Sequence, residues 1–222
     1  MSEPSQDSVF EDTIQYMEIV RISDTSIQHA AQRAASAMAA GSLIVYPTDT
    51  LYGIGVDPAN PQALARVWAL KVRQSKKPIS IIVPDIESIE QYAVLSDTAH
   101  AFAQRFLPGA LTLVLPAKST VPNEITFNNS IGIRIPNDAF CLELSRAFGK
   151  PFTATSANRS GHQTATNPRL ILEQFGPQME EITLAVEDGE RSGTIPSTVV
   201  SFINDVPYIL REGAITREEL GF

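Results

Sequence analysis

Short apolar runs alternate along this chain with longer amphipathic stretches, and this alternation limits the possible folds more than any other feature. Apolar runs typical of buried strands occupy residues 43–46, 79–83, 111–115, 131–135 and 152–154. Helical spacing with capping residues predicts helices over residues 27–40, 61–70, 97–106, 139–148 and 168–175. Further strands are expected at residues 18–22, 184–186, 197–202 and 208–210, and a loop at residues 47–55. Strict strand–helix alternation is not kept, so we expect an α/β or α+β fold with a twisted, mixed, open sheet flanked by helices.

The length of 222 residues fits one domain. We assign residues 18–222 to a single catalytic domain and residues 1–17, which carry acidic residues and no Lys or Arg, to a flexible acidic tail. No apolar run approaches the ~20 residues of a membrane-spanning helix. The N-terminus lacks the basic and apolar regions of a secretory signal. The single cysteine, Cys141, is expected to be a small buried residue, and a cytoplasmic location is expected.

Four polar clusters follow or interrupt the predicted strands, at positions where α/β sheets usually bind ligands. They comprise Thr48, Asp49, Thr50 and Tyr52; Lys71, Arg73, Lys76 and Lys77; Arg134 alone; and Thr153, Thr155, Ser156 and Asn158.

The basic run from Lys71 to Lys77 stands out because the formal net charge of the protein is −8. It is either an anion site or a solvated helix end, where the helix dipole favours cations. The acidic balance argues against broad binding of nucleic acid, which depends on neutralising phosphates. It leaves room for a small groove of positive potential.

Two other clusters also permit two readings. Arg134 stands between isoleucines, so it lies either on a solvent-exposed face or in a cleft, where its guanidinium would bind a carboxylate or phosphate. Residues 155–158 supply hydroxyls and an amide that could orient a ligand, or they form an ordinary polar turn.

Several common site types are absent from the sequence. There is no P-loop, and Gly53 and Gly55 are too few for a dinucleotide fingerprint. The histidines His29, His100 and His162 lack metal-ligand spacing, so no protein-bound metal is expected. No nucleophile elbow supports a Ser-His-Asp hydrolase.

Seven short motifs, in order along the chain, resemble those of the YrdC-like family, whose best-known activity is threonylcarbamoyl-AMP synthase. The resemblance covers residues 19–213. The motifs are residues 46–55 (YPTDTLYGIG), Lys71-Val-Arg73 with Lys77-Pro78, residues 108–112 (PGALT), 133–136 (IRIP), 155–161 (TSANRSG), 196–199 (PSTV) and 211–213 (REG).

The resemblance implies a YrdC-like fold with a large positive cavity on one face. It also implies a nucleotidyltransferase that joins L-threonine, bicarbonate and ATP into L-threonylcarbamoyladenylate and pyrophosphate. The expected catalytic residues are Lys71 and Arg73, and the expected threonine ligands are Thr48, Arg134, Thr153 and Ser197. The expected nucleotide ligands are Lys71, Arg73, Thr155, Ser156, Asn158 and Arg211. Mg²⁺ would accompany ATP. Partner proteins would use the product to modify the adenosine next to the anticodon of tRNA. Any contact of this chain itself with tRNA is expected to be weak.

The departures from the family pattern are mild. Gln74 stands where the family often has Pro, and Ile79 where Leu is common. The chain ends shortly after the 211–213 motif, so we expect the short, single-domain form. It keeps Ser156-Ala157-Asn158, which a paralogous branch of unclear activity loses, and this favours the synthase. The alternatives are an RNA-binding module of the same fold without synthase activity, and a catalytically silent relative acting as a regulator.

Overall fold

The computed structural model describes residues 17–71, 78–190 and 195–222. Its strands are β1 (Glu18–Arg21), β2 (Leu43–Tyr46), β3 (Gly53–Gly55), β4 (Ser80–Ile82), β5 (Leu111–Pro116), β6 (Ser130–Arg134), β7 (Phe152–Ser156), β8 (Ile182–Glu187), β9 (Thr198–Ser201) and β10 (Tyr208–Arg211). Its α-helices are α2 (Ile27–Ala39), α3 (Pro61–Leu70), α4 (Ile86–Ile89), α5 (Asp97–Phe106), α6 (Ala139–Phe148), α7 (Pro168–Phe175) and α8 (Arg217–Leu220). Short 3₁₀ turns are η1 (Ile22–Asp24), η2 (Asn123–Ile125) and η3 (Gly176–Glu181). The tail prediction concerns residues that, apart from Met17, lie outside this description.

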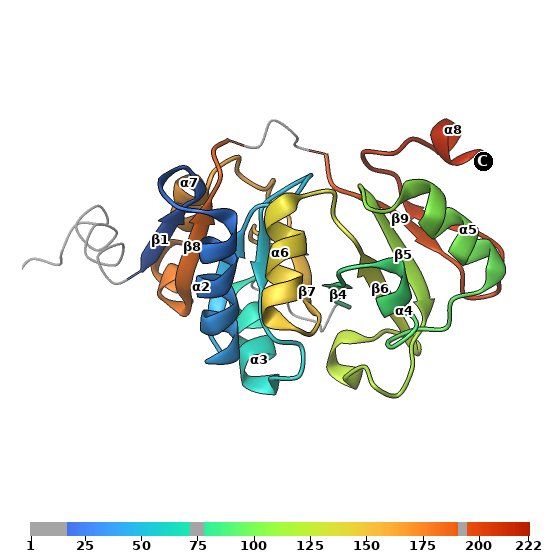
Figure 1. The fold of residues 1–222 in the computed structure, drawn as a ribbon, viewed down its shortest axis with the longest axis horizontal. Coiled ribbons are helices and arrows are strands. Elements are labelled where there is room, and N and C mark those ends of the chain that lie inside the picture. Colours follow the sequence, from blue (N-terminus) through green and yellow to red (C-terminus); the bar gives the residue numbers. More distant parts are fainter. Residues whose placement is uncertain (1–16, 72–77, 191–194) are drawn as a thin grey trace, which may run out of the picture.

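The strands within these residues form one mixed sheet in the order β1-β8-β2-β3-β7-β4-β6-β5-β9-β10. The sheet combines parallel pairs, such as β2 with β8 and β4 with β6, and antiparallel pairs, such as β3 with β7. Helices lie on its faces (Figure 1). This architecture confirms the α/β class expected from the sequence.

Side-chain caps set the starts of the main helices where the sequence predicts them. The Ser26 hydroxyl accepts a hydrogen bond from the His29 amide at 3.1 Å, and α2 begins directly after it. Asn60 caps α3 in the same way with Pro61 as its first residue, and Asp138 caps α6. Such a cap satisfies an amide that has no partner within its helix.

The segment predicted as a loop at residues 47–55 ends in a strand that the sequence analysis missed. Gly53, Ile54 and Gly55 form β3 between β2 and β7. A Cβ atom at Gly53 would lie 2.7 Å from Cζ of Tyr46, so glycine leaves room for that ring. Glycine disfavours strands by propensity, but here the tertiary packing overrides that tendency.

Two apolar cores lie on opposite faces of the sheet. On one face α2 and α6 stand side by side over β1, β8 and β2, and their core includes Leu144 and Cys141, both fully buried (Figure 1). On the other face α3, α5 and α7 pack into a larger core with residues such as Leu64 and Leu113. Helices α2 and α6 do not extend over β5, β6 and β9, and a pocket opens there (Figure 1). In the described part of the chain, no helix is long and apolar enough to cross a membrane.

Candidate functional site

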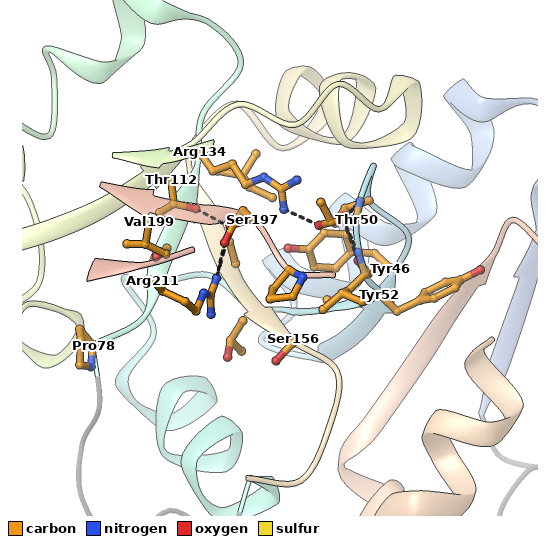
Figure 2. Close-up of a pocket in the computed structure, with 18 residues that line it drawn as sticks. Tyr46, Thr50, Tyr52, Pro78, Thr112, Arg134, Ser156, Ser197, Val199 and Arg211 are labelled. Atoms are coloured by element: carbon orange, nitrogen blue, oxygen red, sulfur yellow. Dashed lines mark hydrogen bonds between the residues drawn. The ribbon is translucent and has the colours of Figure 1, made fainter. Parts of the chain in front are cut away.

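A cavity of about 220 Å³ lies on the sheet face beyond α6 (Figure 2). Its described lining is rich in hydroxyl groups and carries two arginines and no acidic residue. The lining comprises Tyr46, Thr48, Thr50, Leu51, Tyr52, Gly53, Pro78, Ser80, Ile82, Thr112, Arg134, Ala154, Thr155, Ser156, Pro196, Ser197, Val199 and Arg211. These residues come from strands β2, β3, β4, β5, β6, β7, β9 and β10 and the loops beside them, so segments distant in sequence build one pocket.

Strand alternation aims Arg134 into this pocket. Ile131 and Ile133 of β6 are buried in the core, and Gly132 and Arg134 face the other way. A Cβ atom at Gly132 would lie 2.3 Å from Oγ of Ser80, so glycine keeps the pocket floor open. The alternating pattern read from the sequence is therefore confirmed, and its solvent-exposed reading is excluded because Arg134 is only 7% exposed.

Protein groups fix the guanidinium of Arg134 on three sides. One terminal nitrogen donates to the Thr50 hydroxyl at 2.9 Å, and Nε donates to the carbonyl of Gly109 at 3.4 Å. The other terminal nitrogen forms a salt bridge with Asp49. Figure 2 shows Arg134 reaching across to Thr50. The side chain is thus held in one orientation at the wall of the pocket.

Thr48 organises the loop that carries Asp49 and Thr50. Its hydroxyl oxygen accepts hydrogen bonds from the amides of Thr50 and Leu51, at 3.0 and 3.2 Å. It also donates to the carbonyl of Leu51 at 2.7 Å. These local bonds form a tight polar turn. Thr48 therefore shapes the loop as well as lining the pocket.

A second polar chain crosses the opposite wall through Ser197. Its hydroxyl lies 2.8 Å from the Thr112 hydroxyl, and a terminal nitrogen of Arg211 donates to the Ser197 carbonyl at 2.8 Å (Figure 2). Burial, and then the nearby charge of Arg134, lower the pKa of Arg211. Two like charges near one cavity create a site that favours an anion.

The 196–199 and 211–213 motifs interlock around buried Thr198. Its side-chain oxygen accepts hydrogen bonds from the amides of Gly213 and Ile215, at 2.9 and 3.1 Å. A Cβ atom at Gly213 would lie 2.2 Å from the carbonyl oxygen of Pro196. Only glycine permits this close approach. This interlocked contact between residues 196–199 and 211–213, called the clasp below, therefore fixes the positions of Ser197 and Arg211.

Lys71 sits behind the pocket and holds the 155–158 turn. It is 1% exposed, and its ammonium donates to the carbonyl of Ser156 and to Oδ1 of Asn158, the latter at 3.0 Å. The Ser156 hydroxyl also donates to Oδ1 of Asn158 at 2.6 Å. The buried lysine thus ties the end of α3 to the end of β7.

The structure brings most, but not all, of the expected ligands to the pocket. Those that line it are Thr48, Arg134, Thr155, Ser156, Ser197 and Arg211. Lys71 and Asn158 stand behind it, and Arg73, Lys76 and Lys77 lie outside the described residues.

Thr153 requires a correction. Its side chain is fully buried, and its hydroxyl donates to the Ile54 carbonyl at 3.1 Å and accepts from the Val56 amide at 3.0 Å. These bonds tie β7 to β3 and the residue after it. The hydroxyl is therefore a structural link inside the sheet and does not line the pocket.

The sequence analysis assigned no role to three residues that shape the site. Thr50 and Thr112 lie on the lining, and Asp49 pairs with Arg134 from behind. Asp49 and Thr50 belong to a motif that was singled out, but their partner is more than 80 positions away. No local signal in the sequence identifies such a contact.

No group of three or more His, Cys, Asp or Glu side chains in the described ranges could hold a metal ion. The Asp49 carboxylate, which pairs with Arg134 of the lining, is also bonded to the Asn137 amide. Burial raises the pKa of the Tyr46 phenol well above its usual value, so this side chain remains protonated.

Comparison with known proteins identifies the family. The model of the Sua5/YciO/YrdC family, described as "Telomere recombination", matches residues 36–213. The chain belongs to this family. Among its relatives, a Methanocaldococcus jannaschii protein is 36% identical over 81% of this chain and 84% of its own length.

Two longer members of the Sua5/YciO/YrdC family carry names that give an activity or a bound ligand. The Bacillus subtilis threonylcarbamoyl-AMP synthase is 31% identical over 85% of this chain and 54% of its own length. The crystal structure of P. abyssi Sua5 complexed with L-threonine superposes with a TM-score of 0.82 at 31% identity. It covers 92% of this chain and 59% of the Sua5 chain. The chain thus spans somewhat more than half the length of these two relatives.

Proposed function

We propose that this protein is an L-threonylcarbamoyladenylate synthase, an enzyme that makes threonylcarbamoyl-AMP and pyrophosphate from L-threonine, bicarbonate and ATP. The observation that carries the proposal is the pocket with two arginines and a row of hydroxyls, in a chain related to threonylcarbamoyl-AMP synthases. A solved relative named as complexed with L-threonine supports threonine as a substrate.

The proposed reaction has two bond-forming steps. The threonine amine attacks the bicarbonate carbon, and loss of water leaves a carbamate. A carbamate oxygen then attacks the α-phosphorus of ATP, and the bond to the bridging oxygen breaks to release pyrophosphate. The second step transfers an adenylyl group, which makes the enzyme a nucleotidyltransferase. Both steps join groups that the pocket would hold in contact, so positioning supplies much of the rate enhancement.

The two arginines of the lining suit different parts of the substrates. Arg134, held in one orientation, would bind the threonine carboxylate through its remaining N–H groups. Ser197 and Thr48 would contact the rest of the amino acid. Arg211 would stabilise the charge that develops around the α-phosphorus.

The nucleotide would lie along the 155–158 turn. Thr155 and Ser156 line the cavity there, and Lys71 and Asn158 support the turn from behind. Lys71 and Arg73 remain our proposed catalytic cations. Lys71 would contact the phosphates only by exchanging its bonds to Ser156 and Asn158 for bonds to ligand oxygens. Mg²⁺ would enter as the complex of ATP, because no described side-chain cluster is built to hold it.

We place the reaction in the cytoplasm, where ATP and tRNA meet. The product is a mixed anhydride that reacts readily with nucleophiles. A tRNA-modifying partner protein would therefore have to consume it, transferring the threonylcarbamoyl group to the adenosine beside the anticodon.

Pyrophosphate release tests this proposal. We expect release to require threonine, bicarbonate and ATP together, and to fall when serine or valine replaces threonine. Ser197→Ala should lower turnover, whereas Arg169→Ala, which alters an exposed pair on α7, should match the wild type. Release that does not depend on threonine would contradict the proposal, and tight RNA binding without turnover would favour the RNA-binding alternative.

A further inference from the structure

The carboxylate of Asp49 bonds to two elements that are remote from it in sequence. One oxygen accepts the salt bridge from Arg134, and the other accepts a hydrogen bond from the Asn137 amide at 3.0 Å. Asp49 lies in the loop between β2 and β3, whereas Arg134 and Asn137 lie at the end of β6 and just beyond it. This carboxylate therefore connects the β2–β3 loop to the end of β6.

The two pocket arginines differ in their partners. Arg134 and Asp49 are 8% and 13% exposed at their side chains, so theirs is a largely desolvated ion pair. Arg211 contacts the carbonyl and hydroxyl of Ser197, and no described acidic side chain lies within ion-pair distance of it. The charge of Arg134 is thus partly offset by Asp49, whereas the charge of Arg211 has no described acidic partner.

The contacts of Arg134 leave part of its donor set for a ligand. A guanidinium has five N–H donors, and three are directed to Thr50, Gly109 and Asp49. Two N–H groups remain, one on each terminal nitrogen, and this is the number that the two oxygens of a carboxylate require. A guanidinium that is already oriented loses less conformational freedom when it binds.

We infer that Asp49 is a positioning residue for threonine, which fixes the Arg134 guanidinium without touching the substrate. This inference rests on the proposed function. Asp49 is not part of the cavity lining, and both of its oxygens are engaged by the protein. It is therefore placed to act through Arg134 and is poorly placed to take a proton from the amine.

The variant Asp49→Asn tests this role because it keeps the side-chain shape and removes the charge. We expect the KM for threonine to rise about 10-fold, in keeping with the loss of a charged hydrogen bond. The KM for ATP and kcat should stay within about 3-fold of the wild type, because the change acts through one substrate.

Asp57→Asn is a matched control. Asp57 also forms an ion pair, with Lys150, and its side chain is 12% exposed, but it lies outside the catalytic cavity. Both variants remove the charge of a largely buried carboxylate, so both should lower the melting temperature. Only Asp49→Asn should change the KM for threonine.

Two further measurements separate positioning from other roles. Thr50→Val removes another contact to the same guanidinium, so its effect on the threonine KM should be non-additive with that of Asp49→Asn. A threonine-induced rise in melting temperature reports binding without turnover, and this rise should shrink in Asp49→Asn.

Several outcomes would overturn the inference. One is an unchanged threonine KM in Asp49→Asn, and another is an equal rise in Asp57→Asn. A collapse of kcat together with loss of one limb of the pH–rate profile would make Asp49 a proton acceptor instead. Wild-type protein that releases no pyrophosphate but binds threonine would refute the proposed function alone. Protein that neither binds nor consumes threonine would refute both the proposed function and the role of Asp49.

Discussion

One face of the sheet is covered by helices in one part and forms the floor of the pocket in another, and the side chains on that face account for the difference. Over β1, β8 and β2 this face carries Ile44, Leu184 and Val186, and helices α2 and α6 cover it. Over β4, β5 and β6 the same face carries Ser80, Thr112 and other polar or small residues, and it forms the pocket floor. The strands alternate in the same way in both parts.

The comparison shows how one scaffold separates stability from chemistry. Apolar side chains on the covered part are stabilised by removal from water, and the helices that pack over them provide this burial. Hydroxyls and arginines on the open part have hydrogen-bond partners within the wall and can exchange some of them for ligands. Substitutions in the open part should therefore affect activity first, and those in the covered part stability first.

The largest effect on activity is expected from Arg134→Ala in the open part. Removing one partner of a desolvated charge pair costs about 2–5 kcal/mol, so kcat/KM should fall about 30-fold or more. The protein should still fold, because Asp49 keeps its bond from the Asn137 amide. Steady-state kinetics and thermal melting check this together, and a variant with wild-type kcat/KM would refute the role of Arg134.

Leu144→Ala should have the largest effect on stability in the covered part. Leu144 is fully buried between α6 and its neighbours, so the cavity left behind should lower the free energy of unfolding by about 2–5 kcal/mol. Urea unfolding measures this loss. The KM for threonine, measured well below the melting temperature, should stay at the wild-type value. A raised KM would show that the two parts are coupled.

Thr112→Val should have an intermediate effect on activity. The variant keeps the shape of the side chain but removes the hydroxyl that bonds with Ser197. The Ser197 hydroxyl then keeps only its 3.4 Å contact with Arg211 and is less firmly oriented. A hydrogen bond contributes about 1 kcal/mol, so kcat/KM should fall about 5-fold. Val199→Thr, a polar change on the same lining that leaves this bond in place, is the comparison. Equal losses in the two variants would mean that the bond itself is unimportant.

The smallest effect concerns Cys141 in the covered part. Burial, and then the nearby Asp138 carboxylate, raise the pKa of this thiol well above its usual value. The native thiol should therefore resist alkylation at pH 8 until the protein unfolds. Since the native pKa is raised, the related stability is full below the unfolded thiol pKa of about 8.5 and is lost as pH rises through the native value. Rapid alkylation of the native protein would contradict the burial, and Cys141→Ala should lack this pH-dependent loss.

Most of the fold could be predicted because its signals are local. Helices α3 and α5 have the predicted bounds, since Asn60 and Ser96 cap their starts and an apolar face runs along each helix. Strand β3 could not be predicted, because its two glycines carry no strand preference and its pairing depends on β2 and β7. Helices α4 and α8, of four residues each, were also missed because such short segments have little periodicity.

The site was only partly predictable from sequence. Motif order pointed to Arg134, Ser197 and Arg211, and all three line the cavity. The division between lining and supporting residues depends on side-chain direction, which the motifs do not encode. Lys71 and Thr153 illustrate this, because both are buried and bonded inside the protein. The roles assigned to individual residues remain predictions until they are measured.

The clasp between Pro196 and Gly213 has a consequence for how this sequence can vary. The two segments share one tight contact and the buried Thr198 side chain, so neither can change its backbone path alone. Among descendants of this chain, a substitution at position 213 should survive only with a compensating change at 196–198. The two short motifs should therefore be inherited as one unit, although 14 positions separate Ser197 from Arg211.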